Sequence, residues 1–322
     1  MSKKVIIWAS AYNDGDALRR TIDSILGQSY ANFEYIAIDN APGTELFSDI
    51  IGRISGMEYD FLAQIDAGDE YSPGFLETML EFIDAHSLDI ACCGSDFADA
   101  AGNLVGRRVL RKKLIVDNSA AIGGKLPVYY QYVRPFCGKL FSARAINSLN
   151  LKALRATDLG NGADTLFSLA AFQNAGSFGI IDAVLHRYCM YPKPAHRAYH
   201  PKRPLADRVL YDAARDFLAA KAGGVSPRNG EFLHIVYMNA VRDTLDILLR
   251  AEIPESEKIA GVIDIFSHDH MKQLAARPIL GLHIGDASGQ TRRRRELFST
   301  AARWLLSHKD IPDDCIFPRI PL

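Results

Sequence analysis

Short apolar runs alternate with helical patterns through the N-terminal part of the chain, and this alternation limits the fold more than any other feature. Between the runs, apolar residues recur at helical spacing, as at Leu18, Ile22 and Ile25. Repetition of strand, helix and strand is typical of a mostly parallel sheet with covered faces. The sequence therefore predicts an α/β fold. The expected strands are Val5–Ala9, Phe33–Ile38, Phe61–Ile65 and Ile90–Cys93.

The chain changes character at a proline-rich segment, Tyr191–Pro204. Before it, the pattern predicts a hairpin at Phe97–Val109 and a final pair of strands at Phe178–Ile181 and Val184–Tyr188. After it, nearly all the periodicity is helical. We therefore predict a domain at residues 1–200 and a smaller helical region at 201–322. The helical stretches are Leu205–Ala222, Glu231–Ala251, Glu255–Phe266 and Arg293–Ser307.

Composition is that of a soluble globular protein. The chain has 322 residues, a net charge of -1 and 48% hydrophobic residues, so a main domain and a smaller one are expected. Near-neutral charge argues against a nucleic-acid-binding protein. The few cysteines lack metal-binding spacing and are expected to act as small hydrophobic residues in a reducing cytoplasm. With no signal peptide and no apolar stretch that could span a bilayer, a cytoplasmic protein is expected.

One acidic turn stands out against this pattern. The strand at Phe61–Ile65 runs directly into Asp66-Ala67-Gly68-Asp69, and Ser72-Pro73 then predicts the capped start of a helix. The two acids therefore lie at the C-terminal end of a buried strand, where open α/β sheets bind ligands. Carboxylates there can hold a divalent cation whose other ligands are nucleotide phosphates. Taken alone, the stretch is equally consistent with a solvated acidic loop.

An ordered series of motifs covers residues 4–197. The motifs are Ala11-Tyr12-Asn13 with the helix Leu18–Tyr30, Ile38-Asp39-Asn40, Asp66-Ala67-Gly68-Asp69, Gly138-Lys139-Leu140-Phe141, Asp164, and Arg187–Arg197. In this order they resemble the motifs of the family 2 glycosyltransferases. The order of the whole series is more specific than any one motif.

The resemblance implies a GT-A fold, which is a mixed, mostly parallel sheet with helices on both faces. It implies transfer of a sugar, with inversion, from a nucleotide-diphosphate donor to a glycan, lipid-linked or protein acceptor, and a UDP-sugar is the favoured donor. The helical region after the fold would then shape the acceptor side or form an oligomer contact.

The same resemblance assigns residues to roles. Asp164 takes the place of the catalytic base, and the helix that follows it is expected to favour its ionised form through the helix dipole. Asp39 would bind the nucleotide base, and Asp66 the ribose or the metal. The expected ligands of Mn²⁺ or Mg²⁺ are Asp66, Asp69 and His196. The expected donor-binding residues are Ser10, Tyr12, Asn13, Asp39, Asp66, Arg187 and Arg197.

The chain also departs from the family pattern. Ser10 stands in place of a proline, Asn40 and Gly68 in place of acids, and Ala163 in place of a glutamate. The loss at Gly68 matters most, because an acid there would contact the metal directly. Three alternatives follow: Asp69 or His196 compensates, basic residues (Arg187, Lys193 and Arg197) hold the diphosphate without metal, or the protein binds a nucleotide or glycan without catalysis.

Several other features have both a structural and a functional interpretation. His186 is expected to be a hydrogen-bonded structural histidine, and His268 with His270 to lie in a surface loop. Tyr129, Tyr130 and Tyr132 would either stack on a sugar or be half-buried strand residues. The basic run Arg292–Arg295 would bind the inner face of a membrane peripherally, or else form a solvated helix face or a contact in a homo-oligomer.

Overall fold

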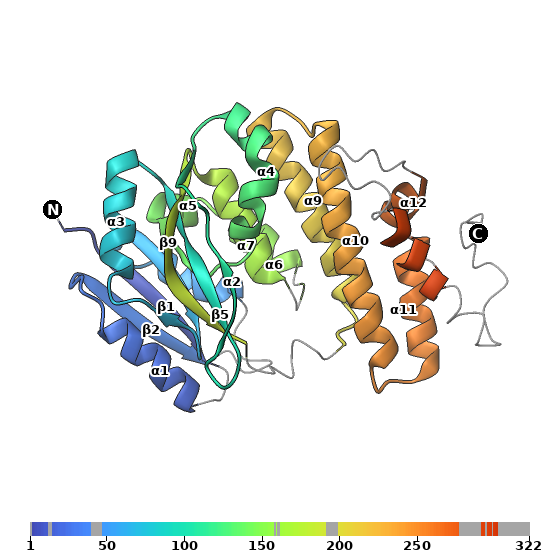
Figure 1. Ribbon diagram of the computed structural model, residues 1–322, viewed down its shortest axis with the longest axis horizontal. Coiled ribbons are helices and arrows are strands. Elements are labelled where there is room, and N and C mark those ends of the chain that lie inside the picture. The colour runs from blue at the N-terminus through green and yellow to red at the C-terminus, as the bar shows by residue number, and fades with distance from the viewer. Residues whose placement is uncertain are drawn as a thin grey trace. The chain divides into compact units, whose positions relative to one another are not determined.

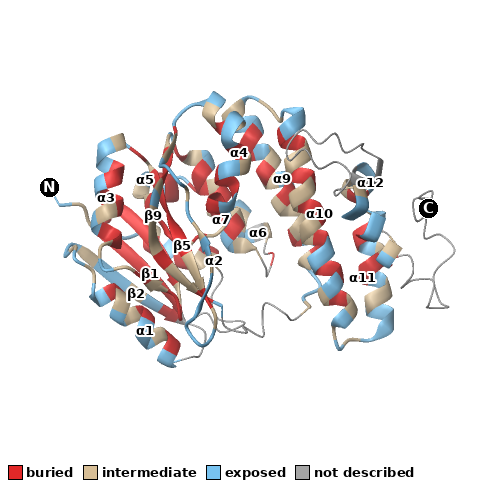
Figure 2. Cartoon of the chain, in the orientation of Figure 1, coloured by how far each residue is buried: buried red, intermediate tan, exposed pale blue. Residues whose placement is uncertain are grey.

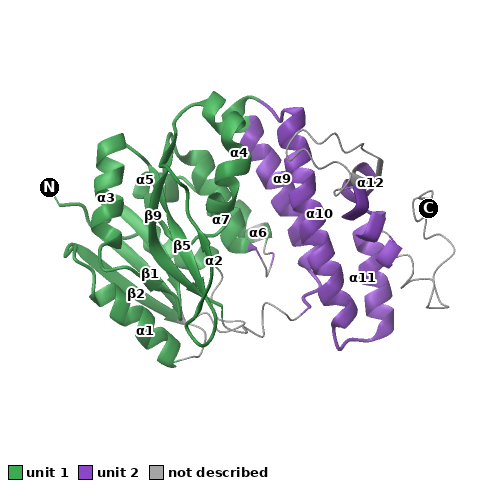
Figure 3. Cartoon of the chain, in the orientation of Figure 1, with its two compact units in different colours: residues 1–158, 163–193, 220–223 green, residues 159–162, 194–219, 224–322 purple. Residues whose placement is uncertain are grey.

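The computed structural model describes residues 2–11, 15–39, 47–157, 159, 162–190, 199–276, 291–293, 295–297 and 299–301. The chain divides into two compact units (Figure 3). The first comprises residues 1–158, 163–193 and 220–223, and the second comprises residues 159–162, 194–219 and 224–322.

The first unit is built on one mixed sheet (Figure 1). Its strand order is β2-β1-β3-β8-β5-β9-β4, with β6 paired to β5 and β7 paired to β9. The longest pairings, β1 with β2, β1 with β3 and β5 with β9, are parallel, whereas β8 lies antiparallel between β3 and β5. The strands are β1 (Val5–Ala11), β2 (Phe33–Asp39), β3 (Phe61–Asp66), β4 (Glu70–Tyr71), β5 (Ile90–Ala98), β6 (Leu104–Arg108), β7 (Leu114–Val116), β8 (Lys139–Ser142) and β9 (Phe178–Cys189).

Helices cover both faces of this sheet. They are α1 (Gly15–Leu26), α2 (Phe47–Ser55), α3 (Phe75–His86), α4 (Ser119–Val133), α5 (Ala143–Asn147), α6 (Leu151–Thr157) and α7 (Ala163–Asn174). Because side chains alternate along a strand, β1 sends Val5, Ile7 and Ala9 into one core with residues of α3. Trp8 lies on the other face and packs against Phe47 of α2. The central strands are accordingly coloured as buried along much of their length (Figure 2), and the predicted fold class is confirmed.

Two local expectations were wrong. The residues predicted as a final pair of strands form the single strand β9, which pairs with β5 on both sides of the register shifts around Gly94. A side chain at Gly94 would meet Arg108 O at 2.7 Å and Ala183 O at 3.0 Å. The helix α3 begins at Phe75 with Gly74 as its N-cap, because Ser72 instead accepts the Phe75 N–H through its backbone carbonyl.

The three clustered tyrosines also lie elsewhere than predicted. Tyr129, Tyr130 and Tyr132 belong to helix α4 and are all buried, so neither the strand nor the sugar-stacking interpretation holds. Tyr129 packs edge-on against Phe178 of β9 and donates its hydroxyl hydrogen to Ile122 O. They are core residues.

The second unit is helical. Its helices are α9 (Arg203–Ala222), α10 (Pro227–Arg250), α11 (Glu255–Ser267) and α12 (Asp269–Ala276), followed by helical residues within 291–301. Ser226 caps α10, with Pro227 at the first position. His268 lies between α11 and α12, and His270 lies in α12, where its Nε2 is 2.8 Å from Asp212 Oδ1. In the part of the chain that the structure describes, every helix is too short or too polar to cross a membrane.

Candidate active site

Strands β1, β2 and β3 end together at one edge of the sheet. Ser10 is paired with Ile38 on one side and with Asp66 on the other, and Ala11 is paired with Asp39. This is the carboxyl edge, where α/β sheets bind ligands. The order of strands therefore brings the backbone positions of three predicted donor-binding residues, Ser10, Asp39 and Asp66, to one place. Tyr12, Asn13, Lys193, His196, Arg197 and the side chain of Asp39 lie outside the described residues.

The acidic turn after β3 has a backbone that requires glycine. Asp69 N–H donates to Asp66 O at 3.0 Å, and Gly68 between them has a φ of 96°. A positive φ at the third residue of such a turn is a glycine conformation. Thr21 of α1 fixes the turn, because its Oγ1 accepts the Gly68 N–H at 2.8 Å and donates to Asp69 O at 2.7 Å. The missing acid thus coincides with a position that disfavours side chains.

Substituting Gly68 with alanine is expected to lower the free energy of unfolding by about 1–2 kcal/mol, because an L-residue with a left-handed backbone costs that much. Urea denaturation followed by circular dichroism measures the effect. Gly124→Ala, in helix α4 where no atom lies within 4 Å of the added Cβ, is the matched control and should be neutral or stabilising. Equal losses in the two variants would contradict the assigned turn.

Gln64, which the sequence analysis did not single out, holds Asp66 in place. It is buried, and its Nε2 donates to Asp66 Oδ1 at 2.8 Å and to Ser10 Oγ at 3.2 Å. Its Oε1 accepts the thiol hydrogen of Cys137 at 3.0 Å. The available signal was a single polar residue within an otherwise apolar strand, directly before the acids. Asp66 itself remains half-buried at the edge of the sheet.

Asp69 is 0% exposed and joins the turn to strand β9. Its Oδ1 accepts the Cys189 N–H at 2.9 Å, and its Oδ2 lies 3.3 Å from His186 Nε2. Burial raises the pKa of Asp69, against the lowering effect of His186. His186 is buried and hydrogen-bonded, as predicted for a structural histidine.

A buried relay of polar groups sets the orientation of His186. Arg108 Nη2 donates to Ser95 Oγ at 3.1 Å, and Ser95 Oγ lies 3.1 Å from His186 Nδ1. Since a guanidinium only donates, the Ser95 hydroxyl hydrogen is available for His186 Nδ1. The ring proton of a neutral His186 then lies on Nε2, directed at Asp69. This arrangement places the Nε2 proton on the side of His186 that faces the Asp69 carboxylate.

Asp164 lies in the first turn of α7, as predicted. Water reaches its side chain, yet the protein around it desolvates the carboxyl group and raises its pKa, and the Asp66 carboxylate raises the pKa further against a backbone hydrogen bond from Thr165. The effect of burial on the pKa of Asp164 opposes the effect expected of the helix dipole. Asp164 is exposed, and Asp66 is one of the groups that raise its pKa.

Arg187, predicted to bind the diphosphate, is engaged with the β5–β6 hairpin. Its Nη2 donates to Gly102 O at 2.7 Å in the turn of that hairpin. The guanidinium is half-buried, and its backbone is paired with Glu70 of β4. This bond uses one of the five N–H donors of the guanidinium.

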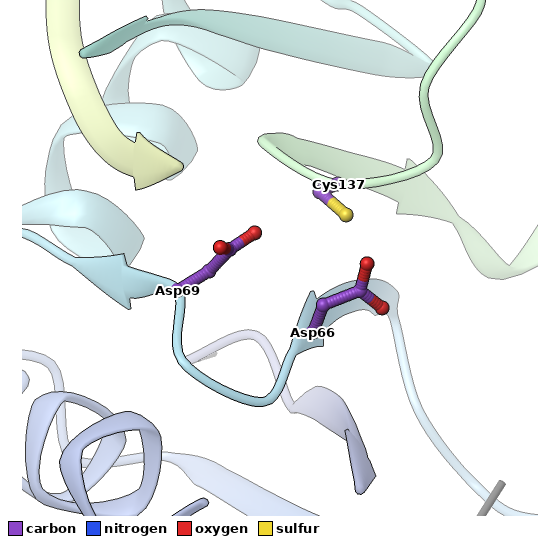
Figure 4. Close-up of side chains that lie close together, drawn as sticks. All are labelled: Asp66, Asp69 and Cys137. Atoms are coloured by element: carbon purple, nitrogen blue, oxygen red, sulfur yellow. The ribbon is translucent and has the colours of Figure 1, made fainter. Parts of the chain in front are cut away.

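Asp66, Asp69 and Cys137 converge in front of the turn (Figure 4). One potential ligand atom from each lies within 4.8 Å of the others. Two carboxylates in this position fit a divalent cation, which accepts oxygen ligands from one or two carboxylates and completes its shell with phosphates and water. The structure thus brings the predicted ligands Asp66 and Asp69 together. Cys137 had been predicted only as a small hydrophobic residue.

Comparison with solved structures defines the class of fold. Structures of S. aureus TarS residues 1–349 match over 96% of this chain and 94–95% of theirs, with TM-scores of 0.54–0.55 and 13–14% sequence identity. Two of them contain UDP-GlcNAc and UDP. The architecture is that of the GT-A glycosyltransferases, with a helical region after it. No protein-family model and no curated protein sequence matches the chain.

Proposed function

We propose that the protein transfers a sugar from a nucleotide-diphosphate donor, with a UDP-sugar favoured, to a hydroxyl group of a glycan, lipid-linked or protein acceptor. The observation that carries the proposal is the convergence of Asp66, Asp69 and Cys137 at the carboxyl edge of a GT-A sheet, with Asp66 also among the groups that raise the pKa of Asp164. The UDP-GlcNAc and UDP complexes of the structurally similar TarS support the choice of a uridine nucleotide.

In the proposed reaction, Asp164 accepts the proton of the acceptor hydroxyl as this oxygen attacks the anomeric carbon. The bond from that carbon to the diphosphate breaks in the same displacement, which inverts the configuration. Asp39 would hydrogen-bond the nucleotide base, and Ser10 would line the donor site beside Asp66. Asp66 and Asp69 would hold Mn²⁺ or Mg²⁺, which when bound neutralises charge on the leaving diphosphate.

Release of free nucleoside diphosphate tests the proposal directly. The full chain is incubated with UDP-, GDP- and dTDP-sugars, with and without Mn²⁺, and with mixed glycan, lipid-linked and peptide acceptors. Acceptor-dependent release of UDP is expected. UDP binding in calorimetry without release from any donor would instead support a binding protein without catalysis, an alternative consistent with the involvement of Asp69 in buried contacts.

The pH dependence of the reaction should report Asp164. A base must be ionised, and the pKa of Asp164 is raised. As pH falls through this raised value, the carboxylate is protonated and kcat/KM should decrease, so the acid limb is expected above the ordinary aspartate pKa of about 3.9. A pH–rate profile of the parent measures the limb. An acid limb at the ordinary value would contradict the desolvated environment assigned to Asp164.

A further inference from the structure

Cys137 is the one member of the convergent group that no part of the proposed mechanism uses. It lies in the segment that joins α4 to β8, far along the chain from the acidic turn, and its side chain is directed at Asp66 and Asp69 (Figure 4). Its thiol donates a hydrogen bond to Gln64 Oε1 at 3.0 Å. Gln64 at the same time donates to Asp66. One buried amide therefore fixes the positions of the thiol and the carboxylate relative to each other.

One carboxylate oxygen of this group is poorly satisfied in the interior of the protein. Among the described residues, Asp69 Oδ2 accepts no hydrogen bond of good geometry, although the whole side chain is buried. His186 Nε2 faces this oxygen at 3.3 Å without making such a bond. A buried oxygen with so weak a contact, beside a second carboxylate, is a position that a cation would satisfy.

We propose that Cys137 is the third protein ligand of a divalent cation held with Asp66 and Asp69, and that its thiolate supplies the ligand that Gly68 lacks. The inference rests on the proposed function only for the role of this edge as the donor site. As the sulfur–metal bond forms, the thiol proton leaves to solvent. Thiolate is a soft ligand, so the site should prefer Zn²⁺ or Co²⁺ over Mg²⁺, which oxygen ligands alone would favour.

The dimensions of the site agree with one ion. Zinc lies about 2.3 Å from sulfur and about 2.0–2.2 Å from carboxylate oxygen, which places tetrahedral ligands about 3.5 Å apart. The three ligand atoms lie within 4.8 Å of one another. Side-chain rotations that move these atoms by about 1 Å would bring them to the spacing of ligands around one ion. Outer contacts that orient metal ligands are also present. Gln64 holds Asp66, while the Cys189 N–H holds Asp69.

Titration with Co²⁺ alone tests the proposal on the full chain. Thiolate-to-cobalt charge transfer gives a near-ultraviolet absorption band that oxygen ligands do not produce. The parent should show this band, Cys137→Ser should lack it, and Zn²⁺ affinity in calorimetry should fall at least tenfold in Cys137→Ser, since even outer contacts are worth 10–100-fold. Cys92→Ala, which removes a buried thiol of strand β5, is the matched control and should keep both.

Asp66→Asn provides a second variant in case Cys137→Ser folds poorly, as judged by near-ultraviolet circular dichroism. It should weaken Zn²⁺ binding while retaining the thiol. A parent without the band, or a Cys137→Ser protein that keeps it, would overturn the proposal. Because metal binding is read without turnover, the band without any donor hydrolysis or transfer would contradict only the proposed function. Transfer with the same dependence on Zn²⁺ concentration in parent and Cys137→Ser would contradict only the thiolate ligand.

Discussion

Replacing Asp164 with asparagine is expected to slow sugar transfer about 10²–10⁴-fold, because an amide cannot accept the proton of the acceptor hydroxyl. Affinity for the donor should remain close to that of the parent, since the base acts on the acceptor. Product formation at saturating donor measures the first quantity, and calorimetric titration with UDP the second. The substitution preserves shape and removes only the ability to take up a proton.

Asp182→Asn is the matched control for this experiment. Asp182 is an exposed carboxylate of strand β9, and its amide variant should transfer sugar at the parent's rate. A general loss of activity in both variants would indicate damage to the fold. If the Asp164→Asn protein transfers sugar as fast as the parent, Asp164 is not the base.

Replacing Asp69 with alanine is expected to lower the free energy of unfolding by about 3 kcal/mol. The carboxylate is completely buried, accepts the Cys189 N–H and faces His186 Nε2. Its removal leaves both donors without an acceptor in the interior, and each such group costs about 1–3 kcal/mol. Urea denaturation at neutral pH measures the loss. Because these contacts join the turn after β3 to the end of β9, we expect their loss to destabilise the whole sheet rather than the turn alone.

The comparison with Asp66→Ala separates stability from binding. Asp66 is half-buried at the sheet edge, so its removal should cost less stability than that of Asp69 while weakening UDP binding. The two aspartates are expected to differ in this way although they lie three residues apart in one motif. If the Asp69→Ala protein unfolds with the same midpoint urea concentration as the parent, Asp69 does not stabilise the fold.

The local pattern of the sequence predicted the edge of the sheet where ligands bind. It did not predict the contacts there between residues that lie far apart in the chain. Parallel strands that end in Ser10, Asp39 and Asp66 follow from apolar runs bounded by polar residues, so their meeting could be predicted. The burial of Asp69 could not, because its partner Cys189 lies 120 residues away and only pairing of β9 brings it near. Gln64 and Cys137, 73 residues apart, were missed for the same reason.

Helix α4 shows a second reason why the sequence did not predict the whole fold. It contains Pro127 and two glycines, Gly123 and Gly124, and the low helix propensity of these residues argues against a helix here. Its buried face of Ile122, Leu126, Tyr129 and Val133 packs in the core, and this packing outweighs the propensities. The aromatic composition of this stretch made a strand one of two interpretations of the tyrosines, because aromatic residues are enriched in strands.

The indole of Trp8 gives the protein a built-in optical reporter. Trp8 is 0% exposed, its ring centroid lies 4.7 Å from that of Phe47, and its Nε1 has no hydrogen-bond partner within the described residues. An indole in such apolar surroundings fluoresces at shorter wavelength than one in water. Trp304 is the second tryptophan of the chain, so a Trp304→Phe protein would emit from Trp8 alone. Because Trp8 precedes Ser10 by two residues on β1, its emission would follow both unfolding of the sheet and occupation of the edge where that strand ends.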